Sequence, residues 1–278
     1  MRYAFTLLLT LTACFAAQTL ALRAVGGRTA KSESNFFSSI GRIQAGATGK
    51  SEVMLLGSSI TGRLPDRAQG YHGWANMGCD GGSAVDVLRA MDEGILPRAP
   101  LLVIEANTLQ LALNQKPTEI AAAMRGPWFK VGLNAPCLAA YARPAAFFYS
   151  KLLARRIGGF DSGTGTGDLE VADGPEWITK PHDDGLTPRQ KALIQEVAAI
   201  LQKMKAKGTH SILVWLPPAR GDGSTPPDWI LELARTGGSR YWDLGQKADS
   251  KWITLTDGVH MAAPSAARAV NSLLKAIY

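Results

Sequence analysis

The chain has 278 residues, of which 46% are hydrophobic and 19% charged, a composition typical of a globular protein and not of a disordered or fibrous one. Its formal net charge is +7, but the lysines and arginines are scattered and form no stripe with interleaved aromatics, which argues against a nucleic-acid partner. The three cysteines, Cys14, Cys79 and Cys137, have no metal-ligand spacing and form no disulfide framework. Cys79 and Cys137 can pair in an exported protein, although we expect each to be a small buried hydrophobe.

The first 23 residues form a targeting segment, which does not belong to the fold. One arginine precedes a run that is nearly all apolar or small, and Arg23 closes this run. Three fates remain open: cleavage after Ala21 as a signal peptide, lipidation at Cys14 in a lipobox-like Leu-Thr-Ala-Cys, or retention as a membrane anchor, since about 20 apolar residues span a bilayer. All three predict a protein that is exported, either periplasmic, anchored to the outer face of a bacterial inner membrane, or secreted.

Residues 24–50 are rich in Gly, Ser and Ala and predict a linker with at most a short helix around 35–43, followed by the main domain over 51–278. Strands are expected where short apolar runs end at turn residues, at 53–56, 71–77, 101–104, 211–216 and 241–244. Helices are expected after an N-cap at Ser83, between Thr187-Pro188 and Gly208, at 229–234, and from Pro264 to the end. This alternation predicts an α/β fold, a three-layer α/β/α sandwich around a mostly parallel five-stranded sheet, as in flavodoxin-like proteins.

The middle of the chain, at about 116–180, reads as a region inserted into this domain. Residues 139–157 predict a basic amphipathic helix with Pro144 near its start, and 158–173 predict a loop. We favour a helix that packs on the sheet and keeps its cationic side in solvent. The alternative is a surface for a membrane or an acidic polymer.

Ser59 follows the first predicted strand directly, at the sheet edge where ligands of parallel α/β proteins bind. A serine nucleophile needs a base, a group that orients the base, and donors for the oxyanion. His260 is a natural base, because the charge of an imidazole changes near neutral pH. Asp257 lies three residues earlier, and Gly258 permits the tight turn that brings its carboxylate to the imidazole.

Four short blocks of the chain resemble the four conserved blocks of SGNH (GDSL-type) hydrolases. They occur in the order of that family, each at the end of a predicted strand or just before the last helix. The blocks are Gly-Ser-Ser-Ile at 57–60, the segment 76–81, Glu-Ala-Asn-Thr at 105–108 and Asp-Gly-Val-His at 257–260. The resemblance runs from about residue 51 to the C-terminus and leaves the middle region unmatched.

The resemblance implies a role for each matching residue. Ser59 is the nucleophile, His260 the base and Asp257 its orienter. The oxyanion donors are the backbone N–H of Ser59, the backbone N–H of Gly81 and the side-chain amide of Asn107, with Gly78 as a rival for the glycine role. No metal and no organic cofactor is implied.

The chain departs from the family pattern twice: Ser58 stands in place of an aspartate, and Glu105 and Thr108 replace a glycine and an aspartate. The resemblance implies an esterase that removes O-acyl groups, such as acetyl, from a saccharide or small ester through an acyl-enzyme. Gly-Ser-Ser also occurs in membrane-anchored relatives associated with acyl transfer, so an O-acyltransferase of the cell envelope or of exopolysaccharide is an alternative. A third is a catalytically silent domain that binds a polymer through its basic middle region. The oligomeric state stays open.

Overall fold

The computed structural model describes residues 2–24, 32–114, 118–157, 172–173, 185–216, 227–244, 253–256 and 260–278. Its centre is a sheet with strand order β2-β1-β3-β5-β6-β4. The first five of these are parallel to their neighbours, and β4 pairs antiparallel to β6 at the edge. The strands are β1 (Val53–Leu56), β2 (Trp74–Asn76), β3 (Leu101–Glu105), β4 (Ala172–Asp173), β5 (His210–Trp215) and β6 (Arg240–Asp243).

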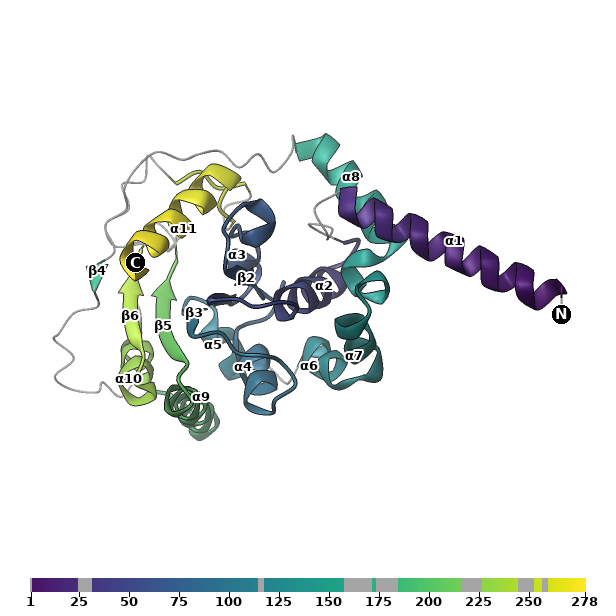
Figure 1. Ribbon diagram of the computed structural model, residues 1–278. Coiled ribbons are helices and arrows are strands. Elements are labelled where there is room, and N and C mark those ends of the chain that lie inside the picture. The colour runs from purple at the N-terminus through teal and green to yellow at the C-terminus, as the bar shows by residue number, and fades with distance from the viewer. Residues whose placement is uncertain are drawn as a thin grey trace.

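Helices cover both faces of this sheet (Figure 1). The α-helices are α1 (Arg2–Ala24), α2 (Asn35–Ala47), α3 (Ser59–Gly62), α4 (Val85–Asp92), α5 (Leu109–Asn114), α6 (Glu119–Arg125), α7 (Pro127–Asn134), α8 (Pro144–Ile157), α9 (Pro188–Ala206), α10 (Asp228–Gly237) and α11 (Ala263–Ile277). Three short 3₁₀ helices are η1 (Arg67–Gln69), η2 (Pro136–Leu138) and η3 (Ala140–Ala142). The predicted α/β/α sandwich is therefore the observed fold.

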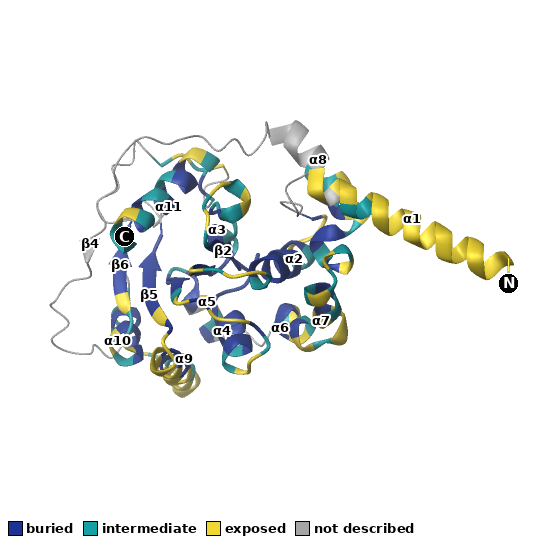
Figure 2. Cartoon of the chain, in the orientation of Figure 1, coloured by how far each residue is buried: buried dark blue, intermediate teal, exposed yellow. Residues whose placement is uncertain are grey.

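The sheet is buried on both faces, as Figure 2 shows by its dark strands. Successive residues of β1 alternate between two apolar clusters: Val53 and Leu55 face α11, whereas Met54 and Leu56 face α4, α9 and α10. This alternation follows from the two-residue period of a strand. It explains why the strand sequences are continuously apolar.

The strand order brings the ends of β1 and β3 to the point where the winding of the sheet reverses. β1 lies between β2 and β3, so the chain runs outward in one direction to β2 and in the other to β3. In open parallel sheets, ligands bind outside the carboxyl ends of the strands at such a reversal. Ser59 follows β1 and Asn107 follows β3, and both therefore lie at this edge.

Several predicted boundaries are wrong by a few residues for local reasons. The second strand begins at Trp74 and not at Tyr71, because Gly73, with φ of +80°, closes a turn in which Trp74 N–H donates to Tyr71 O. The helix after β2 begins at Val85 behind an Ala84 N-cap. The predicted cap, Ser83, lies one residue outside, and its Oγ accepts from Val85 N–H at 3.3 Å.

The predicted helix at 139–157 begins only at Pro144, after the two turns η2 and η3. Arg143 is extended (ψ 139°), because a residue that precedes proline avoids the helical region. α8 packs against η3 and lies away from the sheet, so the preference for a helix packed on the sheet is also wrong (Figure 1). Of the loop predicted at 158–173, only Ala172 and Asp173 are described, and they form β4.

Part of the predicted linker belongs to the folded domain, because α2 is buried in it on all sides from Ser38 to Gly46. Ile43 is fully buried, and Gly41 packs against Tyr141 of η3 so closely that a Cβ would lie 3.0 Å from the Tyr141 nitrogen. Gln44 is 2% exposed. Its Nε2 donates to Phe129 O at 3.1 Å, and its Oε1 accepts from Ala140 N–H at 2.8 Å. The inserted region is therefore attached to the sheet through α2.

Among the described elements, α1 extends away from this body (Figure 1). Within it, residues Arg2–Ala21 form a 20-residue span with mean hydropathy 1.7, long and apolar enough to cross a membrane. Such a helix near an N-terminus is compatible with a signal peptide or a membrane anchor.

We expect Gln44→Ala to destabilise the protein by about 2–4 kcal/mol, because it leaves a buried carbonyl and a buried N–H without partners. Gln202→Ala is the matched control, since that exposed helical glutamine also bonds a backbone carbonyl, Thr236 O. It should stay within about 0.5 kcal/mol of the wild type. Urea unfolding followed by circular dichroism measures both, and equal effects would contradict the role assigned to Gln44.

Candidate active site

Two residues 201 positions apart meet at the carboxyl edge of the sheet. Oγ of Ser59 lies 2.8 Å from Nε2 of His260, which is hydrogen-bonding distance. Ser59 is the first residue of α3, and His260 lies just before α11. Both side chains are partly exposed, so a substrate can reach them. The predicted nucleophile and base are thus brought together.

The other catalytic residue predicted from the sequence, Asp257, lies outside the described residues, as does Gly258. The structure describes the chain on either side of Asp257, up to Thr256 and from His260 onward. Thr256 N–H donates to His260 O at 2.9 Å, Ala262 N–H donates to Thr254 O at 2.7 Å, and Leu255 and Met261 form an antiparallel bridge. This pairing fixes the backbone of His260 opposite Ser59.

A buried carboxylate holds the turn that carries Ser59. Glu105, at the end of β3, is 1% exposed. Its Oε2 accepts from the N–H groups of Ser58 (2.9 Å) and Thr61 (3.1 Å) and from the Thr61 hydroxyl (2.6 Å). Its Oε1 accepts from the Ser58 hydroxyl at 2.9 Å. Four donors, two from Ser58 and two from Thr61, therefore converge on the Glu105 carboxylate.

These contacts leave the hydroxyl of Ser59, and not that of Ser58, available to a substrate. Ser58 is 3% exposed; its hydroxyl donates to Glu105 and accepts from Ile60 N–H at 3.1 Å, so it acts as the N-cap of α3. Ser59 instead points its hydroxyl at His260. Its own N–H is at the first position of α3, where no intrahelical acceptor exists. This geometry agrees with the prediction of Ser59, and not its neighbour, as the candidate nucleophile.

The loop after β2 lies against the same turn. Gly78 approaches it so closely that a Cβ would lie 2.5 Å from Gly62 N and 2.7 Å from Ser58 O. The N–H of Gly78 donates to Asn76 Oδ1 at 2.9 Å and is therefore occupied. Gly81, with φ of +76°, has no hydrogen bond from its N–H to any described residue, and the space around it is open. Of the two glycines, Gly81 is the one with a donor to offer.

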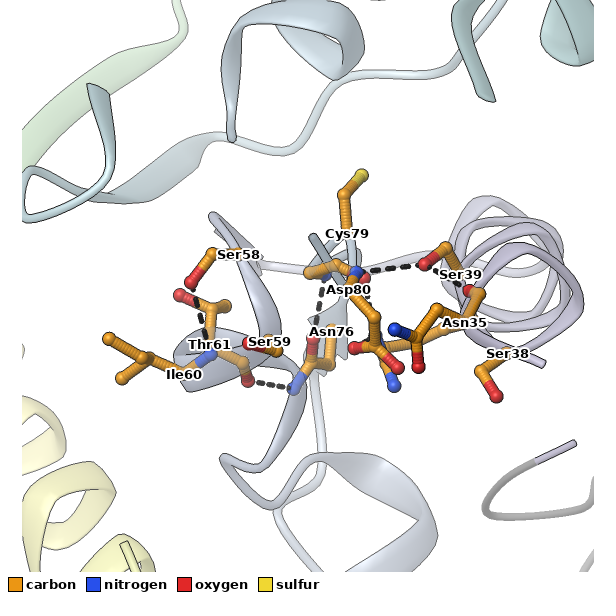
Figure 3. Close-up of polar contacts among 12 residues, drawn as sticks. Asn35, Ser38, Ser39, Ser58, Ser59, Ile60, Thr61, Asn76, Cys79 and Asp80 are labelled. Carbon is orange, nitrogen blue, oxygen red and sulfur yellow. Dashed lines mark hydrogen bonds and ion pairs between the residues drawn. The ribbon is translucent and has the colours of Figure 1, made fainter. Parts of the chain in front are cut away.

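Asn76 and an ion pair fix this loop from two sides; Figure 3 shows Asn76 between Thr61 and the loop, and Asp80 beside Ser39 of α2. Asn76 is 2% exposed, and its amide donates to Thr61 O and Leu64 O, both at 2.7 Å. On the side of α2, Arg42 Nη1 pairs with Asp80 Oδ1 at 3.0 Å and also donates to Gly78 O. Ser39 Oγ accepts from Asp80 N–H at 2.8 Å.

Asn107 is held in a fixed orientation by the end of β5. Its Nδ2 donates to Leu216 O at 2.6 Å, and its Oδ1 accepts from Leu216 N–H at 2.7 Å. A primary amide carries two N–H donors, and among the described residues the second has no partner. The two bonds to Leu216 therefore leave one amide donor free in a defined plane.

Cys79 lies within this loop but has no nucleophilic character. It is fully buried, and this burial raises the pKa of its thiol to about 12. The cysteines are all free, and Cys137 is partly exposed and not buried as predicted. In the described part of the chain, no group of three His, Cys, Asp or Glu side chains is arranged to hold a metal ion.

Reasoning from the sequence found Ser59 and His260 but missed Glu105, Thr61, Arg42 and Asp80 as the support of the site. One signal was available: Glu105 is a charged residue at the end of a buried apolar strand. No comparable signal marked Arg42, because it lies in a segment whose apolar residues show no clear helical or strand period.

We expect Glu105→Ala to cost about 3 kcal/mol or more of stability, since it leaves the four buried donors without an acceptor. Glu105→Gln should cost clearly less. Its oxygen can take the position of Oε2, and its NH₂ can donate to the Ser58 oxygen, which accepts as well as donates. Denaturant unfolding of both variants is the measurement. A Gln variant as unstable as the Ala variant would contradict this account.

Comparisons with protein-family models, with curated proteins and with solved structures found no match for this chain. The resemblance to SGNH hydrolases therefore stays a prediction from the four sequence blocks.

Proposed function

We propose that this protein is a serine-dependent ester hydrolase of the SGNH type. The observation that carries the proposal is the 2.8 Å contact between Ser59 Oγ and His260 Nε2. A serine hydroxyl attacks a carbonyl at neutral pH only when a base in hydrogen-bonding reach accepts its proton. The histidine is held by backbone pairing and the serine by Glu105, so the two side chains are preorganised.

In this mechanism Ser59 attacks the ester carbonyl while His260 takes the proton of its hydroxyl. The tetrahedral intermediate collapses, the alcohol leaves with the proton from His260, and Ser59 keeps the acyl group. Water, activated by the same histidine, then releases the acid. Asp257 is proposed to orient the imidazole, on the strength of its spacing in the sequence.

The oxyanion is proposed to accept from the N–H of Ser59, the N–H of Gly81 and the second Nδ2–H of Asn107. Each belongs to the loop after a different strand, β1, β2 or β3, and these strands are neighbours in the sheet. Donors held rigidly before the reaction stabilise the developing charge without reorganising. The bonds of Asn107 to Leu216 supply this rigidity.

The substrate is proposed to be an O-acyl group, such as acetyl, on a saccharide or a small ester, and the location to be the periplasm or the outer face of a bacterial inner membrane. The apolar helix α1 supports export. Transfer of the acyl group to a sugar hydroxyl would use the same acyl-enzyme, and no described contact favours that acceptor over water.

We expect the protein to hydrolyse p-nitrophenyl acetate and to react with a fluorophosphonate probe at Ser59. Ser59→Ala and His260→Ala should lower hydrolysis by roughly 10⁴-fold or more. His210→Ala is the matched control, because His210 lies exposed at the amino end of β5, at the opposite edge of the sheet. It should retain full activity.

Ser58→Ala separates the two neighbouring serines. It removes the N-cap and one bond to Glu105, so it should lose about 1 kcal/mol of stability but keep the fluorophosphonate adduct on Ser59. A wild-type protein that neither hydrolyses the ester nor reacts with the fluorophosphonate would contradict the hydrolase proposal and favour a binding module.

We expect Asn107→Ala to lower kcat for the same ester by about 10²–10³-fold, the usual loss for one oxyanion donor, with a smaller change in KM. Asn134→Ala controls for the substitution type, since Asn134 is exposed and bonds only within α7, to Lys130 O. Circular dichroism should show that the Asn107 variant stays folded. An unchanged kcat in that folded variant would remove Asn107 from the mechanism.

A further inference from the structure

The polar groups of α1 are satisfied as a helix in lipid requires. The hydroxyls of its threonines donate to carbonyls four residues earlier in the same helix, at 2.8–3.0 Å; these are Thr6, Thr10, Thr12 and Thr19. Such bonds remove the need for an outside partner. Large apolar side chains project around the rest of the helix, among them Tyr3, Phe5 and Leu20.

The exception is Gln18, whose partners lie in the folded body. Its Nε2 donates to Cys137 O at 3.0 Å and to Ala142 O, which are the carbonyls of η2 and η3. α1 thus docks on the inserted region near its C-terminal end, while its N-terminal part extends away (Figure 1). A leader that is cut away has no need of a specific contact with the domain. We therefore take α1 as a retained anchor.

The length of α1 then fixes the position of the inserted region relative to a bilayer. The 20 residues Arg2–Ala21 rise about 30 Å, the thickness of the hydrocarbon core. Gln18 lies three residues before Ala21, or about 4–5 Å short of the end of the span. The elements that Gln18 contacts, η2 and η3, therefore lie near the end of the span, at the boundary between the hydrocarbon core and the lipid headgroups.

The surface around this contact carries large apolar side chains exposed to solvent. Trp128 of α7 is 80% exposed, Phe148 of α8 is 72% exposed and Leu138 of η2 is 47% exposed. α7 packs on η2, α8 packs on η3, and η2 and η3 pack on each other, so the three side chains come from one connected group of elements. Figure 1 shows these elements on the side of the body from which α1 leaves. Tryptophan is favoured at the level of the lipid headgroups.

We propose that the inserted region, from α7 to the start of α8, is a second membrane contact that rests on the lipid surface beside α1, with Trp128 in the headgroup layer. The occupant of this face is the bilayer itself, and the contact does not depend on the proposed hydrolase activity. α2 joins this face to the loop that holds Asp80 and Gly81, so the serine site belongs to a body that lies against the membrane.

The test uses the full chain, purified from the membranes of a bacterial expression host and reconstituted in phosphatidylcholine vesicles. One set of vesicles carries lipids brominated near the carbonyl end of the acyl chain, where bromine quenches tryptophan in the headgroup layer. The chain has seven tryptophans, so the signal is read as the difference between wild type and Trp128→Phe. That variant should lose most of the quenchable emission and stay folded, because the side chain is exposed.

Trp229→Phe is the control, since Trp229 is buried in α10, on the far side of the body from α1 (Figure 1). It should keep the quenchable emission. Equal quenching in wild type and Trp128→Phe would overturn the proposal. It would favour a protein partner or a second copy of the chain as the occupant of this face. An intact mass that lacks the first 21 residues would overturn it as well, because the anchor would be gone.

Discussion

The geometry of the site depends on one buried carboxylate. Glu105 ends β3, and the turn that carries Ser59 follows β1, the neighbouring strand. Parallel pairing puts the two strand ends side by side, and the carboxylate then accepts from the backbone and hydroxyl groups of Ser58 and Thr61. A strand end and the first turn of a helix are thereby locked together. Ser59 is left as the residue of that turn whose hydroxyl faces the histidine.

The same interaction gives a physical account of two of the three residues that differ from the SGNH sequence pattern, Ser58 and Glu105. Ser58 supplies a hydroxyl donor where that pattern has an acid, and Glu105 supplies the acceptor where it has a glycine. Gly57 is required beside them, because a Cβ there would lie 2.4 Å from Glu105 Oε2. Two acids in this buried space would repel each other, whereas a serine and a glutamate are complementary. The two replacements therefore form a matched pair.

The loop that carries Gly81 has its own support, and it comes from outside the sheet. Arg42 of α2 pairs with Asp80 and also donates to Gly78 O. Arg42 and Asp80 both pack closely against Gly62, at the end of the turn that carries Ser59. A buried ion pair adds little net stability but penalises any arrangement that separates the charges. α2 also holds the inserted region through Gln44. The helix thus connects the chemistry at the sheet edge with the face from which α1 emerges.

Short-range patterns in the sequence determined the α/β architecture, the position of β1, the Thr187-Pro188 start of α9 and the choice of Ser59 and His260 as candidate site residues, because apolar runs, caps and motif spacing are local properties. Only the tertiary structure decided the role of Glu105, the inclusion of α2 in the domain and the packing of α8 on η3. Each of these depends on contacts between residues far apart in the chain: Glu105 meets Ser58 across 47 positions, and Gln18 meets Ala142 across 124. No local pattern encodes such a contact, since the partner is chosen by the packing of the sheet and its helices.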